Sequence, residues 1–117
     1  MIAVIGAGPA GSHFSSLYGG DCRVFEEHQE IGKPVACTGI MTRAIFDLVK
    51  LDKEVVVNEL KSVRVLGGKE EAVFPLRERE VVVHRDKLDK YLAERAVDNG
   101  VKIMMGHKFV GCKNGKM

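Results

Sequence analysis

Apolar and polar positions follow a strand, turn, helix and strand pattern over the first residues of the chain. Apolar residues fill 2–5, glycines are dense in 6–11, a stretch that suits a helix covers 9–18, and a second β-rich run at about 22–25 ends at Glu26. This succession predicts a parallel βαβ unit of an α/β fold. We expect strands at 2–5 and about 22–25, joined by a helix over about 9–18.

The spacing of apolar residues changes twice in the middle of the chain. Apolar residues in 40–51 recur at offsets of three and four, which predicts a helix. Over about 54–84 the apolar residues gather in short β-rich runs, and Gly67 with Gly68 predicts a hairpin turn between two of them. The runs are 55–57, 63–65, 72–74 and 81–83. We therefore expect inserted antiparallel strands in this region.

A further helix and strand follow the β-rich region. The apolar spacing predicts a helix that begins near Arg85, with Asp86 as its N-cap and Gly100 as its C-cap. The apolar run at 101–105 predicts the next strand. We therefore expect 81–105 to form a second β-α-β passage.

The last residues carry a turn signal. Residues 109–113 predict a strand, and Asn114 followed by Gly115 is a strong two-residue hairpin signal. Too few residues follow to form the returning strand. We therefore interpret 1–117 as a truncated, N-terminal portion of a single nucleotide-binding domain.

The glycine turn has the residues that a pyrophosphate needs. Gly6 permits the tight turn, Gly8 leaves the backbone open to a phosphate, and Gly11 lets the helix pack close to the strand. Pro9 in the first helical turn loses no hydrogen bond, and Ala10 follows it. The free N–H groups and partial positive charge of this helix start would attract phosphates.

An acid completes the nucleotide signal. Glu26 directly follows apolar Phe25, where a carboxylate accepts hydrogen bonds from ribose hydroxyls. Its neighbour Glu27 is the rival for that role. A carboxylate favours a free 2′-hydroxyl over a 2′-phosphate, so FAD or NAD is expected rather than NADP. The motif leaves FAD and NAD open, and the alternative is a glycine turn in an ordinary α/β protein.

Composition and charge exclude several classes of partner. The 117 residues are 45% hydrophobic and 29% charged, which suits a soluble globular protein. The net charge is +2 and both signs are mixed along the chain, so no nucleic acid partner is expected. No apolar run approaches the roughly 20 residues that cross a bilayer.

Neither the cysteines nor the histidines have metal-ligand spacing. Three scattered cysteines without a CxxC pair argue against a zinc site or a disulfide framework, and they indicate a reducing, cytoplasmic compartment. Cys22 falls in an apolar strand and is predicted to be core. The four histidines are interpreted as structural, although His13 lies on the first helix near its phosphate end. No metal site is predicted.

Four segments combine into a wider motif. They are 6–11, 25–28, 30–39 and 83–89. The first is common among flavoproteins, whereas the Pro-x-x-Cys-x-Gly pattern at 34–39, just after the acid, is more specific. Together they resemble the geranylgeranyl reductase family of flavoproteins, in its archaeal phospholipid-reductase branch. The resemblance implies a Rossmann-like FAD domain of the aromatic-hydroxylase type, interleaved with an antiparallel substrate domain.

The resemblance also implies an activity. Members are FAD-dependent reductases that saturate C=C bonds in the geranylgeranyl chains of archaeal membrane ether lipids. The expected cofactor is therefore FAD, and the expected partner is an isoprenoid lipid substrate. The electron donor is left open. Peripheral contact with a membrane follows only from the lipid nature of the substrate, since no amphipathic anchor is evident.

Two more site residues come from the resemblance. In the family, the loop that corresponds to Cys37 lies near the flavin ring, so Cys37 is predicted to contact the cofactor and to act in catalysis. A plain packing cysteine is the alternative. An arginine at the place of Arg85 lies near the FAD in the family, and a solvated arginine at a helix start is the alternative.

Two other functions stay open. One is a different flavoprotein of the same fold, such as an aromatic monooxygenase or a halogenase. The other is a non-catalytic remnant that binds a nucleotide without turnover. The segment 34–39 favours the reductase over the first of these, through resemblance alone.

Overall fold

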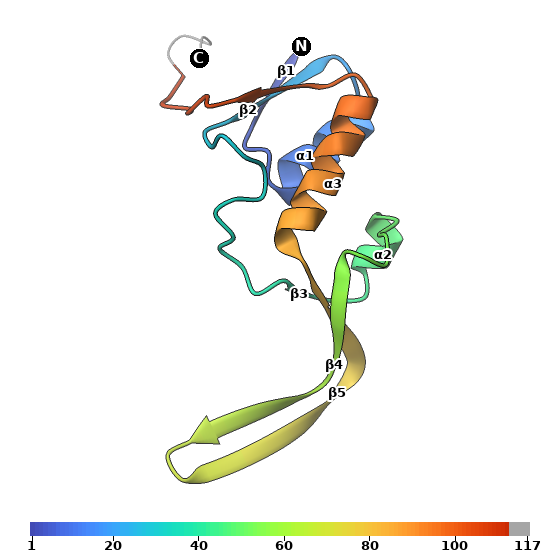
Figure 1. Ribbon diagram of the computed structural model, residues 1–117, viewed down its shortest axis with the longest axis vertical. Coiled ribbons are helices and arrows are strands. Elements are labelled where there is room, and N and C mark those ends of the chain that lie inside the picture. Colours follow the sequence, from blue (N-terminus) through green and yellow to red (C-terminus); the bar gives the residue numbers. More distant parts are fainter. Residues whose placement is uncertain (113–117) are drawn as a thin grey trace. The chain divides into compact units, whose positions relative to one another are not determined.

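The computed structural model describes residues 1–112, which fall into two compact units (Figure 1). The first unit consists of residues 1–36 and the described residues from Asp86 onward, and the second is Cys37–Arg85. Among the described residues, no helix is both long enough and apolar enough to cross a bilayer.

A three-stranded parallel sheet forms the centre of the first unit. Strands β1 (Ile2–Ile5), β2 (Cys22–Glu26) and β6 (Lys102–Met105) lie in the order β1-β2-β6, with β2 paired to both neighbours. Helix α1 (Pro9–Tyr18) connects β1 to β2, and α3 (Arg85–Asp98) leads into β6. The α/β class and the Rossmann-like βαβ unit predicted from the sequence are confirmed.

One buried cluster of this unit, around the central strand, is built from short side chains, while Leu88 and Leu92 of α3 are also buried. Val24 is fully buried in the central strand, and Cys22, Ala7, Ala96 and Val101 pack with it. The prediction that Cys22 is a core residue is confirmed. Ala7 of the glycine turn is a member of this cluster, so the turn is packed directly against the buried strands.

Helix α1 turns its small polar side chains inward. Ser12, Ser15 and Ser16 are buried, whereas the large side chains of Phe14 and Leu17 are exposed. The Oγ of Ser12 donates a hydrogen bond of 2.9 Å to a carbonyl oxygen of the glycine turn. Short side chains on this inner face let the helix lie close to the strands.

Two glycines make this close approach possible. Gly6 has φ of +91°, in the left-handed region that favours glycine. A Cβ on Gly11 would collide with the carbonyl oxygen of Gly6 and press on Val4. The structure therefore supplies the packing reason for Gly11 that the sequence predicts.

Helix α3 ends in a Schellman motif. The N–H of Gly100 donates to the carbonyl of Val97 at 2.8 Å, and that of Val101 donates to Ala96 at 3.0 Å. Gly100 has φ of +82°, the left-handed conformation that this cap requires. The predicted C-cap is thus confirmed. The predicted N-cap is wrong, because the helix begins at Arg85 and Asp86 lies inside its first turn.

The second unit is an antiparallel sheet dominated by one long hairpin. Strands β4 (Val56–Gly67) and β5 (Glu70–Val83) pair with each other, and β3 (Ile40–Met41) pairs with the end of β5. Gly68, with φ of +62°, lies in the connecting turn, which confirms the predicted hairpin. A short helix, α2 (Ile45–Leu48), follows β3.

Several predicted elements differ in this unit. The helix expected over 40–51 is wrong over most of its length, because residues 40–41 form β3 and only Ile45–Leu48 is helical. The four short strands expected over 54–84 are two long ones, since polar residues between the apolar runs also join the ladder. Inserted antiparallel strands are nonetheless present, as expected.

The succession of strand, helix and strand predicted over 81–105 is present as β5, α3 and β6, although β5 and β6 belong to different sheets. The strand predicted over 109–113 is wrong in its described part, because residues 109–112 form no strand. Lys113 and the Asn114–Gly115 hairpin signal lie outside the described residues.

Candidate functional site

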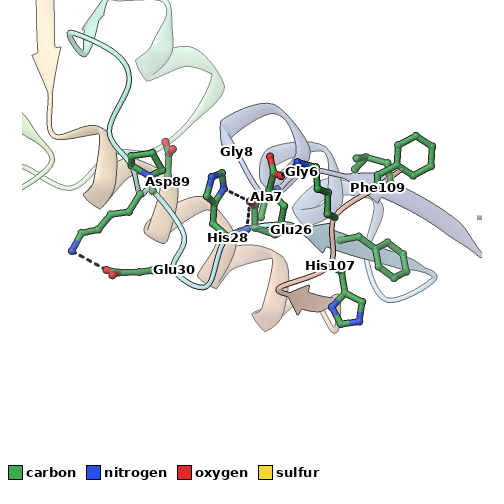
Figure 2. Close-up of a pocket in the computed structure, with 16 residues that line it drawn as sticks. Gly6, Ala7, Gly8, Glu26, His28, Glu30, Asp89, His107 and Phe109 are labelled. Atoms are coloured by element: carbon green, nitrogen blue, oxygen red, sulfur yellow. Dashed lines mark hydrogen bonds and ion pairs between the residues drawn. The ribbon is translucent and has the colours of Figure 1, made fainter. Parts of the chain in front are cut away.

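A cavity of about 370 Å³ opens at the carboxyl ends of the three parallel strands of the first unit (Figure 2). Its walls come from the glycine turn after β1, from the end of β2 and the loop that follows, from α3, and from the segment after β6. They include Gly6, Ala7, Gly8, Glu26, Glu27, His28, Glu30, Lys33, Asp89, His107 and Lys108. Ligands of open parallel sheets bind in this kind of crevice.

Glu26 connects the end of β2 to the glycine turn. Its side chain is largely buried, and its Oε2 accepts a hydrogen bond of 2.7 Å from the backbone N–H of Ala7. Its Oε1 lies 2.9 Å from the backbone N and 2.6 Å from the Nδ1 of His28. The carboxylate therefore holds the turn after β1 and the residues after β2 in one arrangement.

The environment keeps Glu26 ionised. Burial raises the pKa of its carboxyl, but hydrogen bonds from the backbone of His28 and Ala7, together with the His28 ring, outweigh burial and hold the pKa below its ordinary value. An ionised carboxylate accepts hydrogen bonds and donates none. In the cavity, Glu26 is therefore an acceptor suited to hydroxyl groups.

The loop after β2 is fastened to α3. Glu30 pairs with Lys90 of α3 at 2.7 Å and with Lys33 at 3.3 Å. Gly32 has φ of +79°, and a Cβ there would come within 2.8 Å of the Cα of Asp86. The loop therefore lies directly on the first turns of α3, and the cavity wall depends on this helix.

The segment after β6 forms another wall of the cavity. The N–H of His107 donates to the carbonyl of Glu26 at 2.7 Å, and that of Gly106 donates to the carbonyl of His28 at 3.1 Å. Lys108 pairs with Glu27 at 3.2 Å. These contacts continue the pairing of β6 with β2 beyond the sheet, so the backbone around Glu26 is held from both sides.

Only some of the cofactor-binding residues that the sequence predicts line this cavity. Gly6, Gly8, Glu26 and Glu27 line the cavity. The other first-unit residues of the set, Pro9, Ala10 and Gly11, form the first turn of α1.

Some residues that line the cavity were not predicted from the sequence, among them His28, Asp89 and Lys108. Only His28 carried a local signal, its position two residues after the acid. Asp89 and Lys108 lie far along the chain, and no spacing rule reaches them.

Cys37 and Arg85 belong to the second unit. The thiol of Cys37 is exposed and accepts a hydrogen bond from the N–H of Gly39 at 3.5 Å. The N–H of Gly39 and then the guanidinium of Arg85 lower the pKa of this thiol below its ordinary value. Gly39 has φ of +77°, and a Cβ there would collide with the carbonyl of Val83, so this turn is shaped against β5.

Nearly the whole chain aligns with curated archaeal proteins. It is 30% identical over 129 residues to the digeranylgeranylglycerophospholipid reductase of Thermoplasma acidophilum, an alignment that covers 99% of this chain and 33% of that protein. It is 34% identical over 123 residues to the protein of the same name from Methanococcus aeolicus, covering 94% of this chain and 29% of that protein. The chain thus spans about a third of the length of these relatives. No protein-family model matches it.

Solved structures agree with this relationship. A geranylgeranyl bacteriochlorophyll reductase-like protein from Thermoplasma acidophilum superposes with a TM-score of 0.76 at 28% identity, over 96% of this chain and 32% of that one. The halogenase PltM, solved in complex with phloroglucinol and FAD, superposes with a TM-score of 0.68 at 13% identity, over 93% of this chain and 28% of that one. The second likeness concerns the fold alone. By sequence and by fold, the chain is a relative of the geranylgeranyl reductase family of flavoproteins and corresponds to about a third of such a protein.

Proposed function

We propose that this chain supplies the FAD-binding part of a reductase that saturates C=C bonds of geranylgeranyl chains in archaeal membrane ether lipids. The observation that carries the proposal is the Glu26 carboxylate bound to the N–H of Ala7 at the wall of a cavity next to the glycine turn. The names of the curated relatives support the reductase activity, and the same names support an isoprenoid lipid as the substrate.

The glycine turn fits a pyrophosphate. A Cβ at Gly6 or Gly8 would meet no atom within 4 Å, so both residues border open space. Helix α1 begins at Pro9 with Gly8 as its N-cap, and no side chain caps it. Backbone N–H groups and the positive end of the helix dipole are thus available to an anion at this place.

The acids around the cavity suit an unphosphorylated ribose. Ionised Glu26 accepts hydrogen bonds from hydroxyl groups and repels a 2′-phosphate. Its neighbour Glu27 is exposed and pairs with Lys108, which makes Glu26 the better candidate for the ribose. FAD meets these requirements, and the relationship with flavoproteins favours it over NAD.

When bound, the flavin would supply the hydride chemistry that reduces a C=C bond. The residues of the first unit would bind and orient its nucleotide half. We propose Cys37 as the residue that holds a proton for the substrate, at its Sγ, where the N–H of Gly39 and then the guanidinium of Arg85 lower the pKa of the thiol. For the cofactor contacts of Cys37 and Arg85, the support is the resemblance to the family.

An absorbance spectrum tests the proposal. The purified 117-residue chain is mixed with FAD, freed of unbound FAD by gel filtration, and scanned. A retained and perturbed flavin band near about 450 nm is expected. Absence of the band with a folded chain would contradict FAD binding by these residues. Co-flotation with liposomes of archaeal ether lipids checks the membrane contact, and protein left wholly in solution would contradict it.

A further inference from the structure

We infer that His28 is a positioning residue that occupies one oxygen of the Glu26 carboxylate and leaves a single acceptor position for a ribose hydroxyl. The inference rests on the proposed function, because it specifies how the same cavity would hold the ribose. In Figure 2 the dashed contacts join Glu26 to His28 and to Ala7, at the wall of the cavity.

The hydrogen bonds that the Glu26 carboxylate already accepts leave it one acceptor position. A carboxylate has about four acceptor positions, two on each oxygen. The Oε1 of Glu26 receives the backbone N–H of His28 at 2.9 Å and lies 2.6 Å from its Nδ1. The Oε2 receives the N–H of Ala7 at 2.7 Å. One position of the carboxylate is left, and it lies on Oε2.

The ring must be the donor in its contact with Oε1. Glu26 is ionised and has no proton to give, so the Nδ1 of His28 carries the hydrogen. The contact therefore uses a lone pair of Oε1 that a second ribose hydroxyl would otherwise occupy.

The backbone fixes the ring next to the carboxylate. The carbonyl of His28 accepts from Gly106 at 3.1 Å, and the carbonyl of Glu26 accepts from His107 at 2.7 Å. Both residues are thereby held by the segment after β6. Other charges near the cavity have partners of their own, since Glu27 pairs with Lys108 and Glu30 with Lys90.

A ribose presents two neighbouring hydroxyls, and one acceptor position serves one of them. The ring of His28 thus decides how many hydroxyls Glu26 can hold. Its side chain is 48% exposed, so shortening it opens no core cavity and leaves the fold intact.

The experiment measures the affinity of the 117-residue chain for ADP, 2′-deoxy-ADP and 3′-deoxy-ADP by NMR titration. Wild-type chain should lose roughly ten-fold in affinity when one of the two hydroxyls is removed, and nothing when the other is removed. His28→Ala frees Oε1, so that removal of either hydroxyl should then weaken binding. His28→Asn keeps an N–H donor close to the position of Nδ1 and should restore the wild-type pattern.

His84→Ala is the matched control, because His84 is an exposed histidine of the second unit and should leave the pattern unchanged. Equal dependence of wild-type binding on both hydroxyls would overturn the inference while leaving the proposed function standing. So would a His28→Ala pattern identical to wild type. If folded wild-type chain binds no ADP at all, the proposed function itself fails and the inference fails with it. Should His28→Ala not fold, the wild-type pattern and His28→Asn decide.

Discussion

The N–H of Ala7 donates a hydrogen bond of 2.7 Å to the carboxylate of Glu26, and this contact joins the turn after β1 to the end of β2. Ala7 follows β1, and Glu26 ends the adjacent parallel strand β2, so the hydrogen bond stabilises the fold whether or not a ligand is bound. A carboxylate held in this way needs little rearrangement to accept a hydroxyl, which favours binding because less ordering remains to be done.

Replacement of Glu26 by Gln should weaken FAD binding roughly ten-fold or more, because a hydrogen bond to a charged group contributes about 1.5–3 kcal/mol. The amide has a single acceptor oxygen, and its NH₂ group would face either Ala7 or His28. The change is measured by flavin fluorescence titration. Glu27→Gln is the matched control, since Glu27 is exposed and pairs only with Lys108 among the interactions described. A larger loss from Glu27→Gln would reverse the assignment.

Two glycines of the turn should respond differently to alanine. Gly8→Ala meets no atom within 4 Å at a backbone conformation that alanine adopts, so the melting temperature should change little while FAD binding is lost. Gly11→Ala collides with the carbonyl oxygen of Gly6 and should lose stability by about 1–3 kcal/mol. Thermal unfolding by circular dichroism and FAD titration separate the two effects. Unchanged FAD affinity in Gly8→Ala would argue against pyrophosphate at this turn.

Acid should destabilise the chain partly through Glu26. Its pKa is lowered in the folded protein, so its contribution is fully present above the ordinary value of 4.5 and is lost as the pH falls through the lowered value. Between pH 7 and pH 3, wild type should therefore lose stability more steeply than Glu26→Gln. The comparison of melting temperatures cancels the lowered carboxyls of Glu30 and Glu59, which both proteins share. Parallel curves for the two proteins would contradict the prediction.

The thiol of Cys37 should react faster in wild type than in Arg85→Gln. The N–H of Gly39 and the guanidinium of Arg85 lower its pKa, so removal of the guanidinium raises the pKa and reduces the thiolate fraction at neutral pH. The rate of alkylation by iodoacetamide is measured in a Cys112→Ser background, because Cys112 is also exposed and Cys22 is buried. Equal rates would show that Arg85 does not set the acidity of this thiol.

The parts of the fold that local chemistry determines could be predicted. The element boundaries at Gly6, Gly8 and Gly100 follow from glycine conformations and helix caps, which depend on neighbouring residues only. The region around Ile40 could not be predicted in the same way. Its helical spacing was outweighed by pairing with Val82, a partner far along the chain that no local pattern identifies.

The long hairpin and part of the cavity could not be predicted from local sequence patterns either. Over much of their length, β4 and β5 are exposed on both faces, so they lack the alternation of apolar and polar residues by which a half-buried strand is recognised. For the cavity, the glycine turn and Glu26 were found because the nucleotide motif has a fixed spacing. Asp89 and Lys108 reach the same cavity through tertiary packing, which leaves no spacing to detect.

Helix α1, with buried serines at positions 12, 15 and 16 and a glycine pressed against Gly6, implies an unusual pattern of mutational tolerance. In most protein interiors the harmful changes remove atoms. The buried face of α1 consists of glycine and serine residues, so the harmful substitutions should be those that enlarge a side chain. A complete substitution scan of α1 would then show truncations accepted and enlargements rejected, and evolution would be confined at these positions to the smallest amino acids.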